Sequence, residues 1–173
     1  MADPADEALM GAVARGDTAA FETLCRRWER PLLRFLVRQA GPTDAEDLFQ
    51  ETWMRVVRAA AAFDPQRRFS TWLFQIALNL CRDRARRPAP EPVDPSALDA
   101  TAAAPPPDAA AAIDARRLLQ ALPEAQRAAV VLRYWHDLPE DDVATILDIP
   151  RGTVKSRLHQ AMRRLLAVAR GRA

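Results

Sequence analysis

The sequence predicts an all-α protein built from two small helical domains. The chain of 173 residues contains only five glycines and one tyrosine, and it is rich in alanine and arginine. Alanine and arginine lose little side-chain freedom in a helix, whereas the β-branched residues that favour strands are sparse. Apolar residues recur at helical spacing on both sides of one proline-rich stretch. With 49% hydrophobic residues, the chain can bury a core on each side of that stretch.

The proline-rich stretch covers residues 88–112 and contains seven of the fourteen prolines, four acidic residues and no basic one. Proline lacks a backbone donor and disfavours helix in the residue before it, so we expect a flexible acidic Pro/Ala-rich linker. The chain is then divided into a helical domain at 1–87, the linker at 88–112 and a second helical domain at 113–173. The linker would span roughly 25 to 30 Å as a coil and about 78 Å if fully extended, so the domains could bind sites one to two duplex turns apart.

Turn residues separate the helices expected in the first domain. Gly16 breaks a short initial helix, and Asp17 can cap a second one. The second helix has apolar positions at helical spacing: Phe21, Leu24, Trp28, Leu32, Phe35 and Leu36. After Gly41, residues 43–46 have the form of a capping box, which predicts a third helix to about residue 62. Its inward stripe comprises Leu48, Trp53, Val56, Val57 and Ala60. Asp47, Gln50 and Glu51 fall on its outer surface, and the simplest interpretation of these is a solvated face.

A fourth helix is expected from about Ser70, after a basic loop. The end of this helix is rich in cations: Arg82, Arg84, Arg86 and Arg87. Cations suit a helix C-terminus, but four of them against the single acid Asp83 exceed what the macrodipole requires. Phe69 and Trp72 stand among the cations, where aromatic rings could stack on the bases of single-stranded nucleic acid. Taken alone, core packing is the favoured interpretation of these two rings.

The second domain has the pattern of a helix-turn-helix. After helices through residues 118–119 and 124–135, a short helix at about 140–147 and a three-residue turn at 148–150 precede a longer basic helix. That helix has an inward stripe of Val154, Leu158, Ala161 and Leu165. Residues 150–173 carry seven bases and no acid, whereas residues 137–148 carry five acids and no base. A solvated helix normally mixes signs, so this segregation favours DNA against the last helix, with amides near Gly152 and Thr153 available to a phosphate.

Catalytic and metal chemistry find little support in the sequence. His136 and His159 are far apart, neither stands at metal-ligand spacing, and there is no glycine-rich phosphate loop or nucleophile elbow. We therefore expect no enzyme, no cofactor and no bound metal. Cys25 and Cys81 are expected to be buried small hydrophobes. No apolar run approaches a membrane span and no secretory leader pattern is visible, so we expect a cytoplasmic protein.

Motifs in both domains resemble the extracytoplasmic-function sigma factors of bacterial RNA polymerase. The first domain contains DAEDLFQETWMRVV and RRFSTWLFQIALNLCRDRARR, and the second contains LPEAQRAAVVLRYWHDLPEDDVATILDIPRGTVKSRLHQAMRRL. The resemblance implies that the first domain is sigma region 2, which binds core polymerase and recognises and melts the -10 element. It implies that the second domain is sigma region 4, whose helix-turn-helix recognises the -35 element. The chain would then be an alternative sigma factor, and an anti-sigma factor would be a candidate partner because the family often uses one.

The resemblance also implies roles for individual residues. The clamp helices of the large polymerase subunit would bind Asp47, Gln50 and Glu51. The -10 element would be contacted by Arg67, Arg68, Phe69, Ser70, Trp72, Asn79, Arg82, Arg84, Arg86 and Arg87. The -35 element would be contacted in the major groove by Arg151, Thr153, Lys155, Ser156, Arg157 and His159. Pro139 and Asp148 depart from the family pattern, which often has a capping Ser and a Gly at these positions.

Two other classes of protein would explain part of the sequence. A two-domain helix-turn-helix transcription regulator that is not a polymerase subunit would account for residues 113–173. It would also need a sensor or phospho-acceptor domain, and the first domain has the pattern of neither. A helical adaptor that binds only proteins would account for the first domain, but it would leave the charge segregation of the second domain unused.

Overall fold

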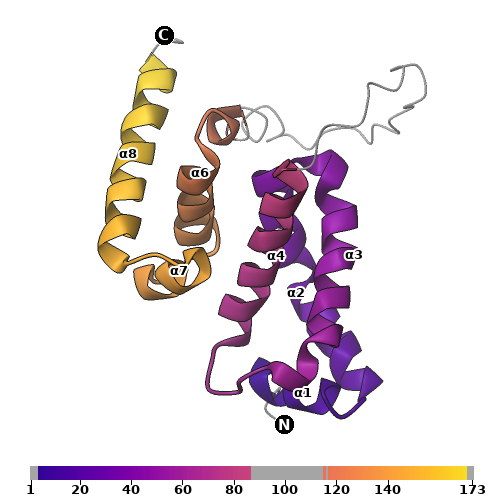
Figure 1. Cartoon of the computed structure of the whole chain (residues 1–173). Helices are drawn as coiled ribbons and strands as arrows, with labels where there is room; N and C mark the ends of the chain where they lie inside the picture. Colours follow the sequence, from indigo (N-terminus) through magenta and orange to yellow (C-terminus); the bar gives the residue numbers. More distant parts are fainter. Residues whose placement is uncertain (1–3, 87–114, 116, 171–173) are drawn as a thin grey trace, which may run out of the picture.

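The computed structural model describes residues 4–86, 115 and 117–170, and over these residues it contains helices and no strand, which confirms the all-α prediction. The first lobe (residues 4–86) consists of α1 (Asp6–Val13), α2 (Thr18–Ala40), α3 (Pro42–Arg58), the 3-10 turn η1 (Ala60–Ala62) and α4 (Phe69–Arg86). The second lobe (residue 115 and residues 117–170) consists of α6 (Glu124–Val130), the π-helical segment η3 (Val131–Trp135), α7 (Glu140–Leu147) and α8 (Arg151–Arg170). Figure 1 shows the two lobes side by side, with α4 facing the second lobe. The linker predicted at 88–112 lies outside the described residues.

The first lobe is organised around α2, which packs against α1, α3 and α4. Aromatic rings fill the space between these helices. The ring of Trp28 meets Phe69 at a centroid distance of 6.0 Å and Phe74 at 5.9 Å, both edge to face. Phe35 meets Phe74 at 5.1 Å. Such ring pairs add about 0.5–1.5 kcal/mol beyond the area that they bury, so they fix how α4 lies on α2.

The ends of α2 and α3 agree only in part with the caps and limits predicted from the sequence. The Asp17 carboxylate accepts a hydrogen bond from the Ala20 amide at 3.1 Å, which confirms the predicted cap. Gly41 separates the two helices with φ at 99°, a conformation that glycine adopts without strain. The predicted capping box at 43–46 is wrong, because α3 already begins at Pro42 and has no side-chain cap. Proline suits this first helical position, since its amide would have been unpaired there anyway. The helix also ends earlier than predicted, at Arg58.

The turn between α7 and α8 is closed by backbone hydrogen bonds. The Asp148 amide donates to the Thr145 carbonyl at 3.3 Å, and the Ile149 amide donates to the Ala144 carbonyl at 3.1 Å. Asp148 itself is left-handed, with φ at 54°. These bonds are the Schellman pattern, which normally uses glycine at this position. The structure thus confirms the predicted limits of the short helix and of the turn before the basic helix.

Among the described helices, none has the length and hydropathy that crossing a bilayer would require.

Candidate nucleic-acid and protein interfaces

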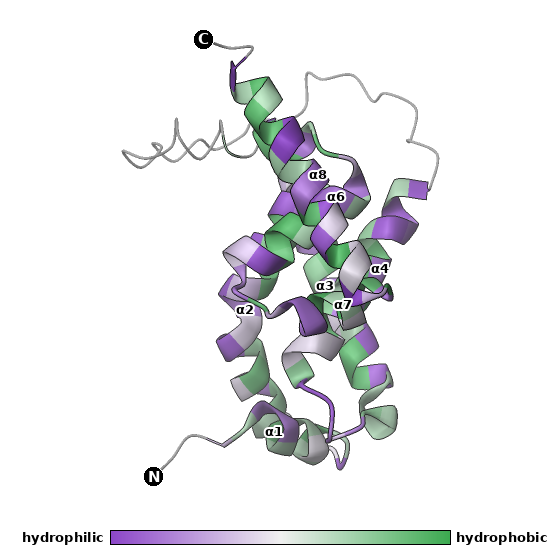
Figure 2. Cartoon of the chain, turned by 90° about the vertical axis from the view of Figure 1, so that its left-hand side faces the viewer, coloured by the Kyte–Doolittle hydropathy of each residue, from purple (hydrophilic) through white to green (hydrophobic). Residues whose placement is uncertain are grey.

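One side of α8 is held by the second lobe and the other is free. Val154, Leu158 and Ala161 are buried, and α8 packs against α6 and α7. Figure 1 shows α8 on the side of the second lobe that is remote from the first lobe, and Figure 2, which looks onto the second lobe, shows hydrophilic positions along its length. The residues predicted to contact the -35 element that are exposed on α8 are Arg151, Lys155, Ser156 and His159. Thr153 and Arg157 are half-buried at the edge of this face.

The acids of α7 meet the first turn of α8. Arg151 pairs with Glu140 at 3.2 Å and with Asp141 at 3.4 Å, and Lys155 lies 3.9 Å from Glu140. These exposed pairs are worth at most about 1 kcal/mol each, so a phosphate can displace them at little cost. Arg157 forms no ion pair within the described part of the chain. The sequence showed that the two charges are segregated, but not that they touch at the turn.

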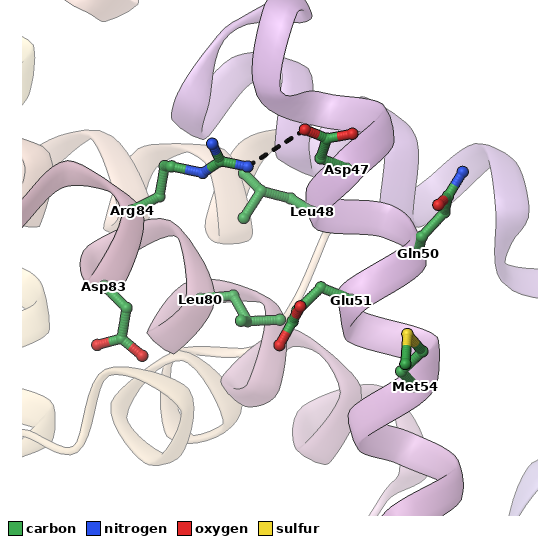
Figure 3. A pocket seen from close by; sticks show the side chains of 8 residues that line it. All are labelled: Asp47, Leu48, Gln50, Glu51, Met54, Leu80, Asp83 and Arg84. Atoms are coloured by element: carbon green, nitrogen blue, oxygen red, sulfur yellow. Dashed lines mark hydrogen bonds and ion pairs between the residues drawn. The ribbon is translucent and has the colours of Figure 1, made fainter. Parts of the chain in front are cut away.

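The residues predicted to bind polymerase lie together on the outer side of α3. Asp47, Gln50 and Glu51 are all exposed and line a surface pocket of about 270 Å³ between α3 and α4 (Figure 3). The other residues that line it are Leu48, Met54, Leu80, Asp83 and Arg84. The pocket is acidic along one rim and apolar at its floor, a combination suited to a protein partner.

Large apolar side chains extend this surface beyond the pocket. Met54 is 51% exposed and Val57 is 47% exposed. The prediction that Val57 faces inward is therefore wrong, because α3 turns this position away from α2. Single exposed apolar side chains are common and need no explanation. Two that neighbour each other beside acidic side chains favour a surface that a protein partner covers.

Arg84 lies apart from the other predicted DNA contacts. Its guanidinium is 3.4 Å from both Asp44 and Asp47 of α3, and Figure 3 shows it pointing toward Asp47. The side chain thus neutralises part of the acidic rim of the α3 pocket. A helical wheel of α4 alone gives no sign of this, because the acids that attract Arg84 belong to another helix.

In the basic loop before α4 the cations are exposed to solvent, and the ring of Phe69, where the helix begins, is buried. Arg67 and Arg68 are exposed, whereas the Phe69 side chain is 0% exposed and its amide donates to the Glu7 carboxylate at 2.9 Å. The core-packing interpretation of Phe69 is confirmed, so this ring supports the loop from beneath. Ser70 is half-buried at the start of α4.

Trp72 is half-buried and stands over the core aromatics. Its ring lies 5.0 Å from that of Phe63 and 6.2 Å from that of Phe69. Asn79 and Arg86 follow at intervals of seven residues, on the same helical face, and both are exposed. Arg87 lies outside the described residues. The half-exposed ring and the two polar side chains form a stripe along α4 that a strand of DNA could follow.

Two of the predicted DNA-contacting arginines face the second lobe. Arg68 lies 2.8 Å from Asp142 of α7, and Arg82 lies 3.4 Å from Glu124 at the start of α6. Glu124 also accepts a hydrogen bond from the Gln39 amide at 3.3 Å. We call the set of contacts between the lobes the seam. It brings together residues far apart in the sequence, and for this reason sequence patterns did not predict it.

His136 is the residue at the seam whose position the sequence least suggests. Its ring lies 4.7 Å from that of Phe74 and 5.9 Å from that of Phe35, and its Nε2 is buried without a hydrogen-bonding partner among the described residues. Burial, assisted by Arg38 and Arg34 and opposed by Asp137, lowers the pKa of His136 to about 4. The imidazole is therefore neutral at the seam. Local sequence patterns give no sign of this position, because the two rings that surround it belong to the other lobe.

The cysteines behave as small apolar groups. Burial raises the pKa of the Cys81 thiol to about 12 and that of Cys25 to about 11. Both thiols are thus protonated and unreactive at neutral pH. Within the described residues, no group of three His, Cys, Asp or Glu side chains is placed to hold a metal ion.

Comparisons with known proteins identify families for both lobes. The family model "Sigma-70 region 2" matches residues 24–89, and "Sigma-70, region 4" matches residues 113–165. The chain is 37% identical to the ECF RNA polymerase sigma factor SigM of Mycobacterium tuberculosis, over 92% of this chain and 82% of that protein. It is 32% identical to the ECF RNA polymerase sigma factor SigW of Bacillus subtilis, over 86% of this chain and 88% of that protein. Among solved structures, CnrH in complex with the cytosolic domain of CnrY matches with a TM-score of 0.77 and 27% identity, over 98% of this chain and all of that one.

Proposed function

This chain belongs to the extracytoplasmic-function group of the sigma-70 family, and we propose on that premise that it is an alternative sigma factor. It binds core RNA polymerase and directs transcription initiation at promoters with specific -10 and -35 elements. The observation that carries the proposal is the presence, in one chain, of a free cationic face on a helix-turn-helix and a separate acidic and apolar face on α3. A DNA-binding regulator would need only the first face, and a protein adaptor only the second.

The second lobe acts as region 4 and reads the -35 element with α8. The Schellman turn fixes the angle between α7 and α8, and Val154 and Leu158 anchor α8 with its cationic face outward. Lys155 and Arg157 are placed to contact base edges or phosphates in a major groove. The first amides of α8, around Gly152 and Thr153, add an anion site at the helix N-terminus.

The first lobe acts as region 2. Glu51 and its neighbours on α3 bind the clamp helices of the large polymerase subunit, and the exposed Met54 and Val57 supply apolar area to that interface. The basic loop and the outer face of α4 bind the -10 element. Trp72 can stack on an unpaired base while Arg67 and Arg86 follow the phosphates.

The protein acts as an initiation factor and not as a catalyst, without a cofactor or metal, in the cytoplasm where polymerase and promoters are found. We place the division between the functional units at residues 87 and 113, with the linker at 88–112 spanning from one promoter element to the other. An anti-sigma factor is a candidate regulator. Support comes from the solved match, in which CnrH is bound to the cytosolic domain of CnrY.

Transcription with purified components tests the proposal. The chain is mixed with core polymerase and a library of genomic fragments, and transcripts are sequenced. We expect start sites that core polymerase alone does not use, sharing one pair of upstream elements. The Lys155→Glu, Arg157→Glu variant is the matched control, and it should lose those starts while still binding polymerase. The absence of any specific transcript across the library would contradict the proposed function.

A further inference from the structure

The seam covers part of the surface that the first lobe needs for DNA. Arg68 and Arg82 each have a carboxylate of the second lobe within ion-pair distance, at 2.8 Å and 3.4 Å. The side chain of Arg82 is only 24% exposed, whereas that of Arg68 is 66% exposed, so the seam covers Arg82 and engages Arg68 only through its ion pair. In the same arrangement, α8 lies on the opposite side of the second lobe and stays free (Figure 1). The closed chain can therefore present its region 4 surface, but not its whole region 2 surface.

The ion pairs alone cannot hold the seam closed. In each pair one partner is more than a third exposed, so solvent keeps the contribution small and salt lowers it further. Buried apolar side chains of both lobes form one continuous cluster, and the imidazole of His136 lies within this contact, inserted against Phe35 of α2 and Phe74 of α4. Arg127 of α6 adds a hydrogen bond from its guanidinium to the carbonyl of Gln39, at 2.9 Å. The apolar contact that closes the seam thus includes one titratable ring.

The surroundings of His136 accept only the neutral imidazole. The charged groups that act on it are Arg34 and Arg38 of α2, which repel a second cation, and Asp137 of its own loop, which attracts one. From α4 it meets the uncharged ring of Phe74. The guanidinium of Arg38 lies 5.5 Å from the centre of the Trp135 ring, which holds that cation close to the seam. A proton on His136 would place a third cation beside two others, on a ring whose Nε2 is buried.

We propose that the seam is an autoinhibitory latch in which neutral His136 locks the second lobe over the DNA-binding arginines of the first, and that protonation of His136 opens the chain. That the latch inhibits DNA binding rests on the proposed role of Arg68 and Arg82 in binding the -10 element. The opening itself does not depend on that role, because it concerns only the two lobes of this chain.

The direction of the pH effect follows from linkage. The pKa of His136 is about 4 in the closed chain, and in an open chain it returns toward the ordinary 6.5. The closed chain binds fewer protons, so its advantage is complete above pH 6.5 and is lost as the pH falls toward 4. With these two pKa values, the ratio of closed to open chains falls about 4-fold at pH 6 and about 30-fold at pH 5, relative to its value at high pH, where the imidazole is neutral in both states.

Small-angle X-ray scattering of the full chain tests the latch without reference to transcription. We expect a compact chain at pH 7.5 that expands between pH 6.5 and pH 5. The His136→Phe variant keeps an aromatic ring at the seam but cannot take a proton, so it should stay compact at pH 5. His136→Arg should be expanded at pH 7.5, whereas Asp137→Asn, which makes the same change in net charge next to it, should not. Equal scattering of the wild type at both pH values, or equal expansion of His136→Phe, would overturn the latch.

Binding of short mixed-sequence single-stranded DNA at pH 7.5 tests the masking. His136→Arg and Asp137→Asn each add one positive charge, so any difference between them reports opening and not net charge. We expect several-fold tighter binding by His136→Arg, and we expect Arg68→Ala with Arg82→Ala to remove that gain. Equal affinities of the two variants would overturn the masking. If scattering shows the expansion but transcription with core polymerase gives no specific transcript, the latch stands and the proposed function fails. The two failures can therefore be told apart.

Discussion

The two surfaces proposed to bind DNA are built in opposite ways. The surface of α8 is made within one lobe, since Val154 and Leu158 anchor the helix and its cations follow one face. The surface of α4 is divided: Arg84 turns toward α3, Arg82 turns toward α6, and Trp72 remains on the outside. One surface is ready in the free chain, and the other depends on where the second lobe lies.

Reversing charge on α8 should have the largest effect on the free chain. We expect Lys155→Glu with Arg157→Glu to weaken binding to mixed-sequence duplex DNA by about 100-fold at about 0.1 M salt, because each lost phosphate contact removes about 0.9 log units of affinity per decade of salt and the new anions repel the backbone. If about four cations of α8 meet phosphates, log affinity should fall with log salt at a slope near -3.6, and the slope should become shallower in the variant. Titration by fluorescence anisotropy measures both quantities.

The matched control reverses two charges of the first lobe. Arg26→Glu with Arg30→Glu alters exposed positions of α2 that belong to none of the proposed interfaces. It should lower the affinity by no more than its change in net charge explains. A loss equal to that of the α8 variant would show that α8 is not the prominent DNA surface of the free chain.

Loss of Arg127 should give the next largest effect, on stability. Its guanidinium donates to the carbonyls of Leu119 and Leu122, both at 3.1 Å, and to that of Gln39 across the seam. Arg127→Met keeps most of the aliphatic stem but removes the donor to the carbonyls of Leu122 and Gln39, while that of Leu119 keeps the Leu122 amide, and the loss should cost about 2–3 kcal/mol of unfolding free energy. Urea denaturation followed by circular dichroism measures it.

Arg133 offers a comparison within the same lobe. Its guanidinium stands over the Tyr134 ring at 5.8 Å, and that ring is 49% exposed. An exposed contact of this kind contributes about 0.5–1 kcal/mol, so Arg133→Met should be the milder change. Equal destabilisation by the two variants would mean that the carbonyl contacts of Arg127 do not organise the lobe.

A change on α3 should affect polymerase and leave the DNA affinity of the free chain unchanged. Glu51→Arg reverses an exposed charge at the rim of the α3 pocket, and we expect roughly 10-fold weaker binding to core polymerase, or about 1.4 kcal/mol. Glu29→Arg makes the same reversal on α2, away from the pocket, and should bind as the wild type does. Competition for polymerase with a labelled wild-type chain measures the difference. Undiminished binding by Glu51→Arg would remove α3 from the interface.

Local sequence patterns predicted what lies within one helix or one turn. The cap at Asp17, the limits of α7 and the buried stripe of α8 all follow from spacing of a few residues, because neighbours along a helix are neighbours in space. The patterns failed where the outcome depends on another element. The pairing of Arg84 with α3, the outward turn of Val57 and the insertion of His136 between two phenylalanines arise from tertiary contacts. The predicted contacts to polymerase and promoter remain predictions that these experiments address.

The smallest expected effect concerns the turn that orients α8. Asp148 is held at φ 54°, where the Cβ of an L-residue costs about 1 kcal/mol and aspartate is tolerated better than most. Asp148→Gly should relieve this strain and raise the unfolding free energy by about 0.5–1 kcal/mol, while the backbone bonds to Thr145 and Ala144 persist. Asp148→Ala also removes the carboxylate but keeps a Cβ, so it should bring no gain. Both variants lack the carboxylate, but only glycine lacks a Cβ and adopts this φ without strain. Equal stabilisation of the two variants would therefore show that the carboxylate, and not the backbone conformation, is the source of the strain.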